Sequence, residues 1–256
     1  MGGAARTHGL TSMTMLNLLA IDCSTERLVL AVACGERSWV LDEVGGAASS
    51  ARALPAIQEL LVAADLRLAD LDAIAYARGP GAFTGLRTAC ALAQGLAFGV
   101  GKPVLAIDSL LIVAEAARVE GGVTAADLWV AMDARMNEAY AARYGWHDRG
   151  WQTLSEPALW TAAALTAQLA EDGGTPCVVG SAIDAGLITA IDPRRGASAQ
   201  ARAPALLRLA GAAWRDGQRL DAAQALPVYL RDKVAQTTRE RDALRQRAAG
   251  ATGDAP

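Results

Sequence analysis

The segment Ile74-Ala-Tyr-Ala-Arg-Gly-Pro-Gly-Ala-Phe-Thr-Gly-Leu-Arg87 runs directly into Thr88-Ala-Cys-Ala-Leu-Ala-Gln-Gly-Leu-Ala97. It predicts a buried strand, a glycine-rich turn and a helix made largely of small residues. Gly79, Gly81 and Gly85 allow a positive φ and let other atoms approach the backbone closely. Backbone amides at such a turn can face an anion or a neighbouring chain, so the turn is a candidate site or interface. The alternative is a tight turn that only starts the helix.

The segments on both sides of this turn predict mixed sheets flanked by helices. Apolar runs alternate with stretches in which apolar residues recur at helical spacing. The first unit has expected strands at 16–22, 28–33, 38–44, 71–77 and 103–107, and expected helices at 50–64, 84–100 and 108–118. A similar cycle follows, with expected strands at 128–133, 138–146, 151–160 and 177–180, a helix ending at 171 and another at 204–216. Two related α/β lobes are the economical interpretation.

The composition indicates a soluble globular protein. The chain has 256 residues, 52% of them hydrophobic, and its formal net charge is −3. A membrane span needs about 20 consecutive apolar residues, and the sequence has no such run, so we expect a cytoplasmic protein without membrane contact. The slight negative charge excludes the basic field that drives nucleic-acid binding by phosphate neutralisation. A mildly basic run between Arg231 and Arg247 is most simply a solvated helix end before a disordered tail.

The histidine and cysteine content argues against a metal site. His8 and His147 are the only histidines, so the sequence contains neither H-E-x-x-H nor H-x-x-x-H. The cysteines show no C-x-x-C spacing and lie in or beside apolar segments, as expected of small buried hydrophobes in a reducing compartment. They are Cys23, Cys34, Cys90 and Cys177. We therefore expect no metal to be bound by this chain.

Four segments together resemble the TsaB (YeaZ) family, over a match from Leu16 to about Val234. They are Leu19-Ala-Ile-Asp-Cys-Ser-Thr25, Gly79-Pro-Gly-Ala-Phe-Thr-Gly-Leu-Arg87, Ala131-Met-Asp-Ala-Arg-Met-Asn-Glu-Ala-Tyr140 and Pro227-Val-Tyr-Leu-Arg231. The second segment is the specific one, whereas the others carry weight through their order and spacing. The resemblance implies a two-lobed actin/Hsp70/sugar-kinase-like (ribonuclease H-like) fold.

The resemblance also implies a function without chemistry of its own. Members of this family are non-catalytic scaffold subunits in bacterial synthesis of tRNA threonylcarbamoyladenosine (t6A). The paralogue TsaD holds the catalytic metal and TsaE supplies a P-loop ATPase, so ATP and metal belong to partner subunits and no cofactor is expected here. The expected partners are TsaD in a heterodimer, TsaE, a second copy when the chain is alone, and tRNA only through the complex. The histidine pair of TsaD aligns with Ser109 and Val113 here, and Ser109 is more simply a helix cap.

The first hairpin is a candidate degenerate nucleotide site. In an actin-like ATPase, Asp22, Ser24 and Thr25 would hold a hydrated magnesium ion and cradle a phosphate. Cys23 stands where such hairpins usually have glycine, and Asp-x-Ser-Thr is also a good turn sequence, so a purely structural role is the alternative. A second phosphate hairpin would need glycines after its acidic residue, but Asp133 is followed by Ala-Arg-Met.

Two other polar turns leave alternatives open. Asp133, Arg135 and Glu138 would form either a polar cluster at the junction of the lobes or a solvated surface turn. Gly180-Ser-Ala182 is either the relic of an adenine-binding loop or, as we favour, a strand-to-helix turn.

The glycine-rich turn and the two helices of the first unit predict a partner surface. Phe83 is a large apolar residue in a turn and needs cover, and Arg87 in the first turn of the helix needs an acid or an anion. The candidate contact residues of the turn are Gly79, Gly81, Phe83, Thr84, Gly85 and Arg87. Both helices are apolar on more than one side, which predicts dimerisation or, alternatively, burial under the second lobe. The candidate interface residues are Leu54, Ile57, Leu61, Ala89, Leu92, Ala93 and Leu96.

These observations predict a flexible leader at 1–15, an N-terminal actin-like lobe at 16–107, a smaller lobe at 108–235 and a disordered tail at 236–256. The main alternative function is an actin-like ATPase or small-molecule kinase with degenerate phosphate loops. A metalloprotease is opposed by the lack of a histidine pair. A stand-alone RNA-binding module would need a basic face with aromatic residues, whereas the six tryptophans are scattered.

Overall fold

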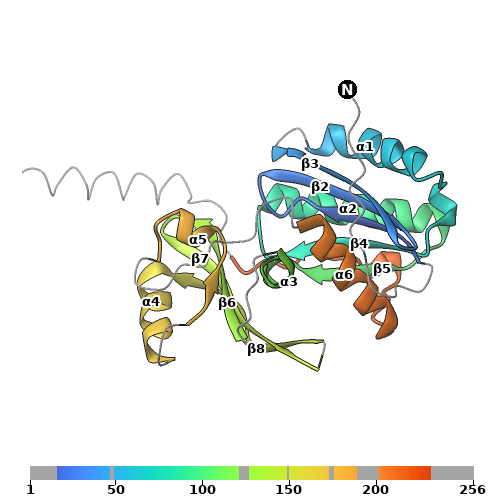
Figure 1. Ribbon diagram of the computed structural model, residues 1–256. Coiled ribbons are helices and arrows are strands. Elements are labelled where there is room, and N and C mark those ends of the chain that lie inside the picture. The colour runs from blue at the N-terminus through green and yellow to red at the C-terminus, as the bar shows by residue number, and fades with distance from the viewer. Residues whose placement is uncertain are drawn as a thin grey trace, which may run out of the picture.

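The computed structural model describes residues 16–46, 49–120, 127–148, 150–172, 176–188 and 202–231. These residues form two mixed sheets that lie side by side, each flanked by helices (Figure 1). The predicted α/β fold with two lobes is confirmed. The predictions for the leader at 1–15, the tail at 236–256 and nearly all of the basic run after Arg231 lie outside the described residues.

The first sheet has five strands in the order β3-β2-β1-β4-β5. Their bounds are β1 Asn17–Asp22, β2 Arg27–Cys34, β3 Arg37–Val44, β4 Ala73–Gly79 and β5 Val104–Asp108. β1 is central and pairs antiparallel with β2 and parallel with β4. Its apolar sequence is buried along nearly its whole length because helices cover both faces of the sheet.

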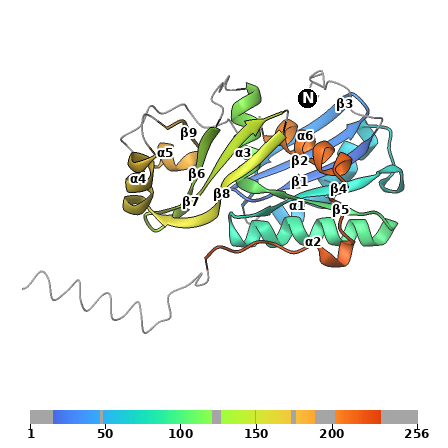
Figure 2. The ribbon, with the colours of Figure 1, turned by 90° about the horizontal axis from the view of Figure 1, so that it is seen from below.

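The helices α1 (Ser49–Ala63) and α2 (Phe83–Val100) cover one face of this sheet, and α6 (Arg202–Arg215) covers the other. Figure 2 shows α2 and α6 on opposite sides of the strands. Short 3-10 turns, η2 (Leu68–Asp70) and η4 (Ala222–Gln224), lie on the α1 and α2 side. Sequence analysis placed 204–216 in the second lobe, but α6 buries its apolar face against β1, β2 and β5. The chain therefore returns to the first lobe at its C-terminal end.

The second sheet has the order β8-β7-β6-β9. Its strands are β6 Asp127–Arg135, β7 Glu138–His147, β8 Gly150–Thr161 and β9 Val178–Val179. The helices α4 (Ala162–Glu171) and α5 (Ser181–Asp184) pack on one face. The helix α3 (Ser109–Glu120) packs on the other face and also contacts α6 and β4, so it lies between the lobes (Figures 1 and 2).

Candidate functional site

The glycine-rich turn packs directly on the first hairpin. A Cβ atom built on Gly81 would lie 2.4 Å from the Ser24 carbonyl oxygen, and one on Gly85 would lie 1.8 Å from the Cys23 carbonyl oxygen. The amide of Ala82 donates to the Ser24 carbonyl oxygen at 2.8 Å. The close approach that these glycines allow is therefore made within the chain, and a contact of this turn with an anion or a partner stays a prediction.

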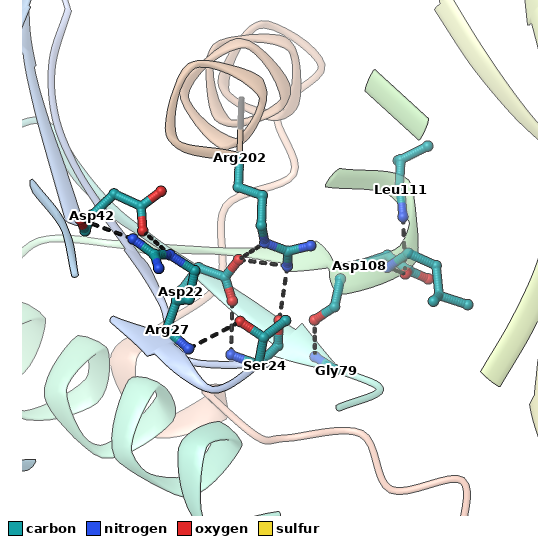
Figure 3. A network of polar contacts seen from close by, with 11 residues as sticks. Asp22, Ser24, Arg27, Asp42, Gly79, Asp108, Leu111 and Arg202 are labelled. Atoms are coloured by element: carbon teal, nitrogen blue, oxygen red, sulfur yellow. Dashed lines mark hydrogen bonds and ion pairs between the residues drawn. The ribbon is translucent and has the colours of Figure 1, made fainter. Parts of the chain in front are cut away.

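The first hairpin brings Asp22 and Ser24 together with an arginine that sequence analysis did not single out. Arg202, the first residue of α6, donates from Nε and Nη2 to Asp22 Oδ2 at 2.8 and 2.6 Å, and from Nη2 to Ser24 Oγ at 2.9 Å (Figure 3). The Ser24 amide donates to Asp22 Oδ1 at 2.8 Å. All three residues are buried. Thr25, half-buried, instead accepts from the amide of Arg27 at 3.2 Å.

Cys23 in the same hairpin is buried rather than reactive. Burial and the nearby Asp22 carboxylate raise the pKa of the Cys23 thiol to about 12. Because the thiolate is the nucleophilic form, this side chain behaves as a small apolar residue.

Phe83 and Arg87 contact Tyr229, near the end of the described chain. The Phe83 and Tyr229 rings lie 4.9 Å apart between centroids, and the Arg87 guanidinium lies 4.0 Å from the centroid of the Phe83 ring. Arg87 Nε donates to the Tyr229 hydroxyl at 3.0 Å. In the part of the chain that the structure describes, Arg87 has no carboxylate partner. Thr84 is exposed beside this cluster.

Residues 226–231, which we call the C-terminal strap, connect the two lobes. The strap begins at the buried hydroxyl of Tyr76, to which the Leu226 amide donates at 3.0 Å. The Val228 amide donates to the Arg78 carbonyl oxygen at 2.7 Å. At the other end, Arg231 pairs with Glu138 at 2.6 Å and donates to the Ala134 carbonyl oxygen at 2.9 Å. Figure 2 shows the strap passing from the side of α2 to the second lobe.

The second hairpin makes a polar junction between the lobes. Asp133 and Arg135 pair at 3.3 Å, and Arg135 also pairs with Glu26 of the first hairpin. Glu138 completes the set through Arg231 of the strap. Each of the two interpretations, a polar cluster at the junction of the lobes and a solvated surface turn, is correct in part. The charges lie at the junction, and Arg135 is nevertheless exposed to solvent.

The two positions that the sequence aligned with the TsaD histidines are both used for contacts within this chain. The Ser109 hydroxyl accepts from the Gly79 amide at 3.0 Å, and Val113 is buried in the core between α3 and the second sheet. The prediction that Ser109 caps the helix is wrong. Asp108 is the cap, since its Oδ1 accepts from Leu110 and Leu111 at 2.7 and 3.3 Å.

Asp108 gives a pH-dependent prediction. Burial raises the pKa of its carboxyl, although the capping amides and the charge of Arg78 favour the ionised form. Since the folded pKa lies above the unfolded one, ionised Asp108 lowers stability near neutral pH, and this cost vanishes as the pH falls below the usual aspartate pKa of about 3.9.

We therefore expect Asp108→Asn, which keeps the capping oxygen, to raise the unfolding midpoint slightly at about pH 8, with the gain disappearing near pH 4. Denaturant unfolding of both proteins at several pH values measures this difference. A loss of stability that is the same at every pH would contradict it.

The helices proposed for dimerisation present different residues from those that the pattern selected. Ile57, Leu61, Ala89 and Ala93 are buried against the first sheet. Leu92 and Leu96 are half-buried beside them, and Leu54 is 44% exposed. The outward surface also contains Val62, Ala91, Gly95, Phe98 and Gly99. The periodicity was ambiguous because both helices also hold apolar or small residues at exposed positions. Dimerisation itself stays a prediction.

Other polar features add no site. Gly180 has φ 117° and begins α5, so Gly180–Ala182 is a strand-to-helix turn, as favoured from the sequence. Among the described residues, no three His, Cys, Asp or Glu side chains are grouped as a metal site would require. Within the same residues, no helix combines the length and apolarity needed to cross a membrane.

Arg202 and the strap are the functional features that sequence reasoning missed. The rule applied to Arg87 also holds for Arg202, because an arginine in the first turn of a helix needs an acidic partner. That rule predicts a partner but not which one, since Asp22 lies 180 positions away. The strap was noticed only as a short motif, because its contacts are made with residues far away in the sequence, such as Tyr76, Phe83 and Glu138.

Comparisons with known proteins identify relatives of this chain by sequence and by fold. Residues 40–187 match the family described as "TsaD: tRNA N6-adenosine threonylcarbamoyltransferase". The "tRNA threonylcarbamoyladenosine biosynthesis protein TsaB" of Haemophilus influenzae is 41% identical over 128 residues, which cover 50% of this chain and 53% of that protein. The solved structure "YeaZ from Pseudomonas aeruginosa" is 34% identical, with a TM-score of 0.69, and the match covers 84% of this chain and 100% of that one.

A further relative extends over nearly the full length. The "tRNA threonylcarbamoyladenosine biosynthesis protein TsaB" of Escherichia coli (strain K12) is 31% identical over 231 residues, which cover 86% of this chain and 96% of that protein. The fold that the resemblance implied, a ribonuclease H-like fold of the actin/Hsp70/sugar-kinase type, is the one that these matches support. With this identity and coverage, the chain belongs to the TsaB family.

Proposed function

We propose that this chain is a non-catalytic scaffold subunit in t6A synthesis. It dimerises with the metal-bearing paralogue TsaD through α1 and α2 and helps to recruit the ATPase TsaE. The names of its relatives support the pathway. The observation that supports the scaffold role is the outward face of α1 and α2, where Leu54, Val62 and Phe98 are 44%, 79% and 79% exposed. Large apolar side chains exposed on two neighbouring helices are typical of a surface that a partner covers.

The shape of this face suits a helical partner. Apart from the backbone of α2 itself, no atom of the described residues lies within 4 Å of a Cβ built on Gly95 or Gly99, so α2 is open on its outward side at these two positions. Small residues let the backbone of a partner helix approach closely, while Phe98 and Val62 supply apolar area at the edges. A four-helix arrangement, with two helices from each subunit, buries all of these residues.

Gly95→Glu tests the proposed interface without disturbing the monomer. The position is exposed and open, and glutamate is a better helix former than glycine, so the variant is expected to fold. A charge that becomes buried and unpaired in the complex costs about 3–5 kcal/mol, which weakens binding to TsaD by a factor of about 100 or more. Size-exclusion chromatography of the mixture with TsaD measures complex formation, and a reconstituted reaction with TsaD, TsaE and tRNA measures t6A.

Ala167→Glu on α4 is the matched control, because it adds the same charge to an exposed helical position of the other lobe. It is expected to bind TsaD and to support t6A synthesis like the wild type. If Gly95→Glu elutes with TsaD as the wild type does, this surface is not the interface. If wild-type chain and TsaD elute separately, or if t6A forms equally well without the chain, the scaffold proposal is overturned.

A further inference from the structure

A charge-balanced cluster lies behind the first hairpin (Figure 3). It contains two acids, Asp22 and Asp42, and two arginines, Arg27 and Arg202. Arg27 pairs with the Asp42 carboxylate and donates to the Asp42 carbonyl oxygen at 3.0 Å, while Arg202 binds Asp22. The side chains of Asp22 and Arg202 are 1% and 6% exposed. Inside the protein, such a pair is screened little by solvent.

The atoms of Asp22 that a cation would need are already in use. One carboxylate oxygen accepts two bonds from Arg202 and the other accepts the Ser24 amide. In an actin-like ATPase, the aspartate of this hairpin faces a hydrated magnesium ion and the hairpin amides face phosphate. The residues present do not fit a magnesium ion with a bound phosphate. The Arg202 guanidinium already binds the Asp22 carboxylate, and the Ser24 amide donates to Asp22 instead of facing a phosphate.

The hairpin is also held from its other side. The glycine-rich turn presses against the Cys23 and Ser24 carbonyl groups so closely that a Cβ on Gly81 or Gly85 would clash. The hairpin therefore has no room to move away from Arg202. Because Arg202 is anchored by α6, which packs across the same sheet, α6 and β1 are fixed to one another at the point where a nucleotide phosphate would bind.

We propose that the Arg202 guanidinium occupies the place that a cation and a phosphate would take at this hairpin. In the absence of nucleotide, it holds α6 against β1 within the first lobe. The cluster is neutral as it stands, so a divalent cation or a nucleotide would add an unbalanced charge. This role goes beyond the proposed scaffold function. It concerns a site inside the first lobe, away from the outward face of α1 and α2.

Two variants of the full-length chain test the proposal by thermal unfolding and by Mn²⁺ binding, the latter measured as loss of the EPR signal of free Mn²⁺. Arg202→Gln leaves Asp22 buried without its partner, and the unfolding midpoint is expected to fall by about 10 °C. Millimolar Mn²⁺ is expected to bind this variant and restore part of the loss, because the cation takes the place of the guanidinium. The double variant Asp22→Asn with Arg202→Gln removes both charges and is expected to remain within about 4 °C of the wild type.

Wild type and double variant are expected to show no change of midpoint with Mn²⁺ or with the Mn²⁺ complex of a non-hydrolysable ATP analogue. Stabilisation of the wild type by either addition, lost in the double variant, would overturn the proposal. So would an Arg202→Gln variant that is as stable as the wild type or that folds without responding to Mn²⁺. If Arg202→Gln does not fold while the double variant does, the loss is due to the unpaired carboxylate, which supports the proposal. If neither variant folds, neutral side chains cannot replace the Asp22–Arg202 pair, and the proposal fails.

Discussion

Gly85→Ala is expected to destabilise the protein by about 3 kcal/mol, at the upper end of the usual cost of overpacking. The added methyl group would lie 1.8 Å from the Cys23 carbonyl oxygen and 2.9 Å from its carbonyl carbon. Both atoms belong to the backbone of the hairpin between β1 and β2, so no change of rotamer relieves the clash. Either α2 or the hairpin must move, and a shift of the hairpin also disturbs Asp22. Denaturant unfolding measures the loss as a lower midpoint.

Gly95→Ala and Gly99→Ala in the same helix are the matched controls. Apart from the helix's own backbone, no atom of the described part of the chain lies within 4 Å of a Cβ at either position. Alanine is a better helix former than glycine, so each control is expected to gain about 0.5–1 kcal/mol. If all three variants change stability equally, the cost at Gly85 is one of helix propensity and the close packing on the hairpin does not matter.

The glycine-rich turn shows how far sequence reasoning reaches. Hydrophobic periodicity and the glycines predicted β4, the turn and α2 to within about two residues, because these features depend on neighbours in the chain. The glycines also predicted a close approach. They did not tell whether the approaching atoms belong to a ligand, a partner or the chain itself, and the structure supplies Cys23 and Ser24 for two of them.

The features that sequence reasoning did not find depend on contacts between distant residues. Arg202 meets Asp22 only because α6 returns to the first sheet, which the lobe boundary at 107 did not foresee. The outward sides of α1 and α2 were not identified because exposed positions of both helices also hold apolar or small residues, so few polar side chains mark the side that faces solvent. Asp108 and Ser109 are both good helix caps by sequence, and the Gly79 amide decides between them by binding Ser109.

The contacts between the lobes hold the described chain in a defined shape. Arg135 and Glu26 join the two hairpins, the strap joins the Phe83 cluster to Glu138, and α3 is packed between the sheets. These side chains and the strap therefore join the two lobes at three separate places.

Glu115 is the polar centre of the α3 contact, and Glu115→Ala is expected to cost about 2–4 kcal/mol. Its carboxylate, 4% exposed, accepts from Arg118 Nε and Nη2 and from Trp151 Nε1, each at 2.9 Å. The Arg118 guanidinium lies 4.0 Å from the centroid of the Trp146 ring, and that ring lies 5.1 Å from the ring of Trp151. Without the carboxylate, the Trp151 N–H group loses its acceptor and Arg118 its counter-charge.

Burial is what distinguishes this pair from an exposed one of the same chemistry. Glu59 on α1 also accepts two bonds from one arginine, Arg52, at 2.8 and 2.9 Å, but its side chain is 62% exposed. Glu59→Ala is therefore expected to lower the unfolding midpoint much less than Glu115→Ala, since exposed pairs are screened by water. Denaturant unfolding followed by tryptophan fluorescence compares the two variants, and only Glu115→Ala should shift the emission of the folded state. If the two losses are equal, the burial of Glu115 does not matter, and α3 is held against the second sheet through apolar packing alone.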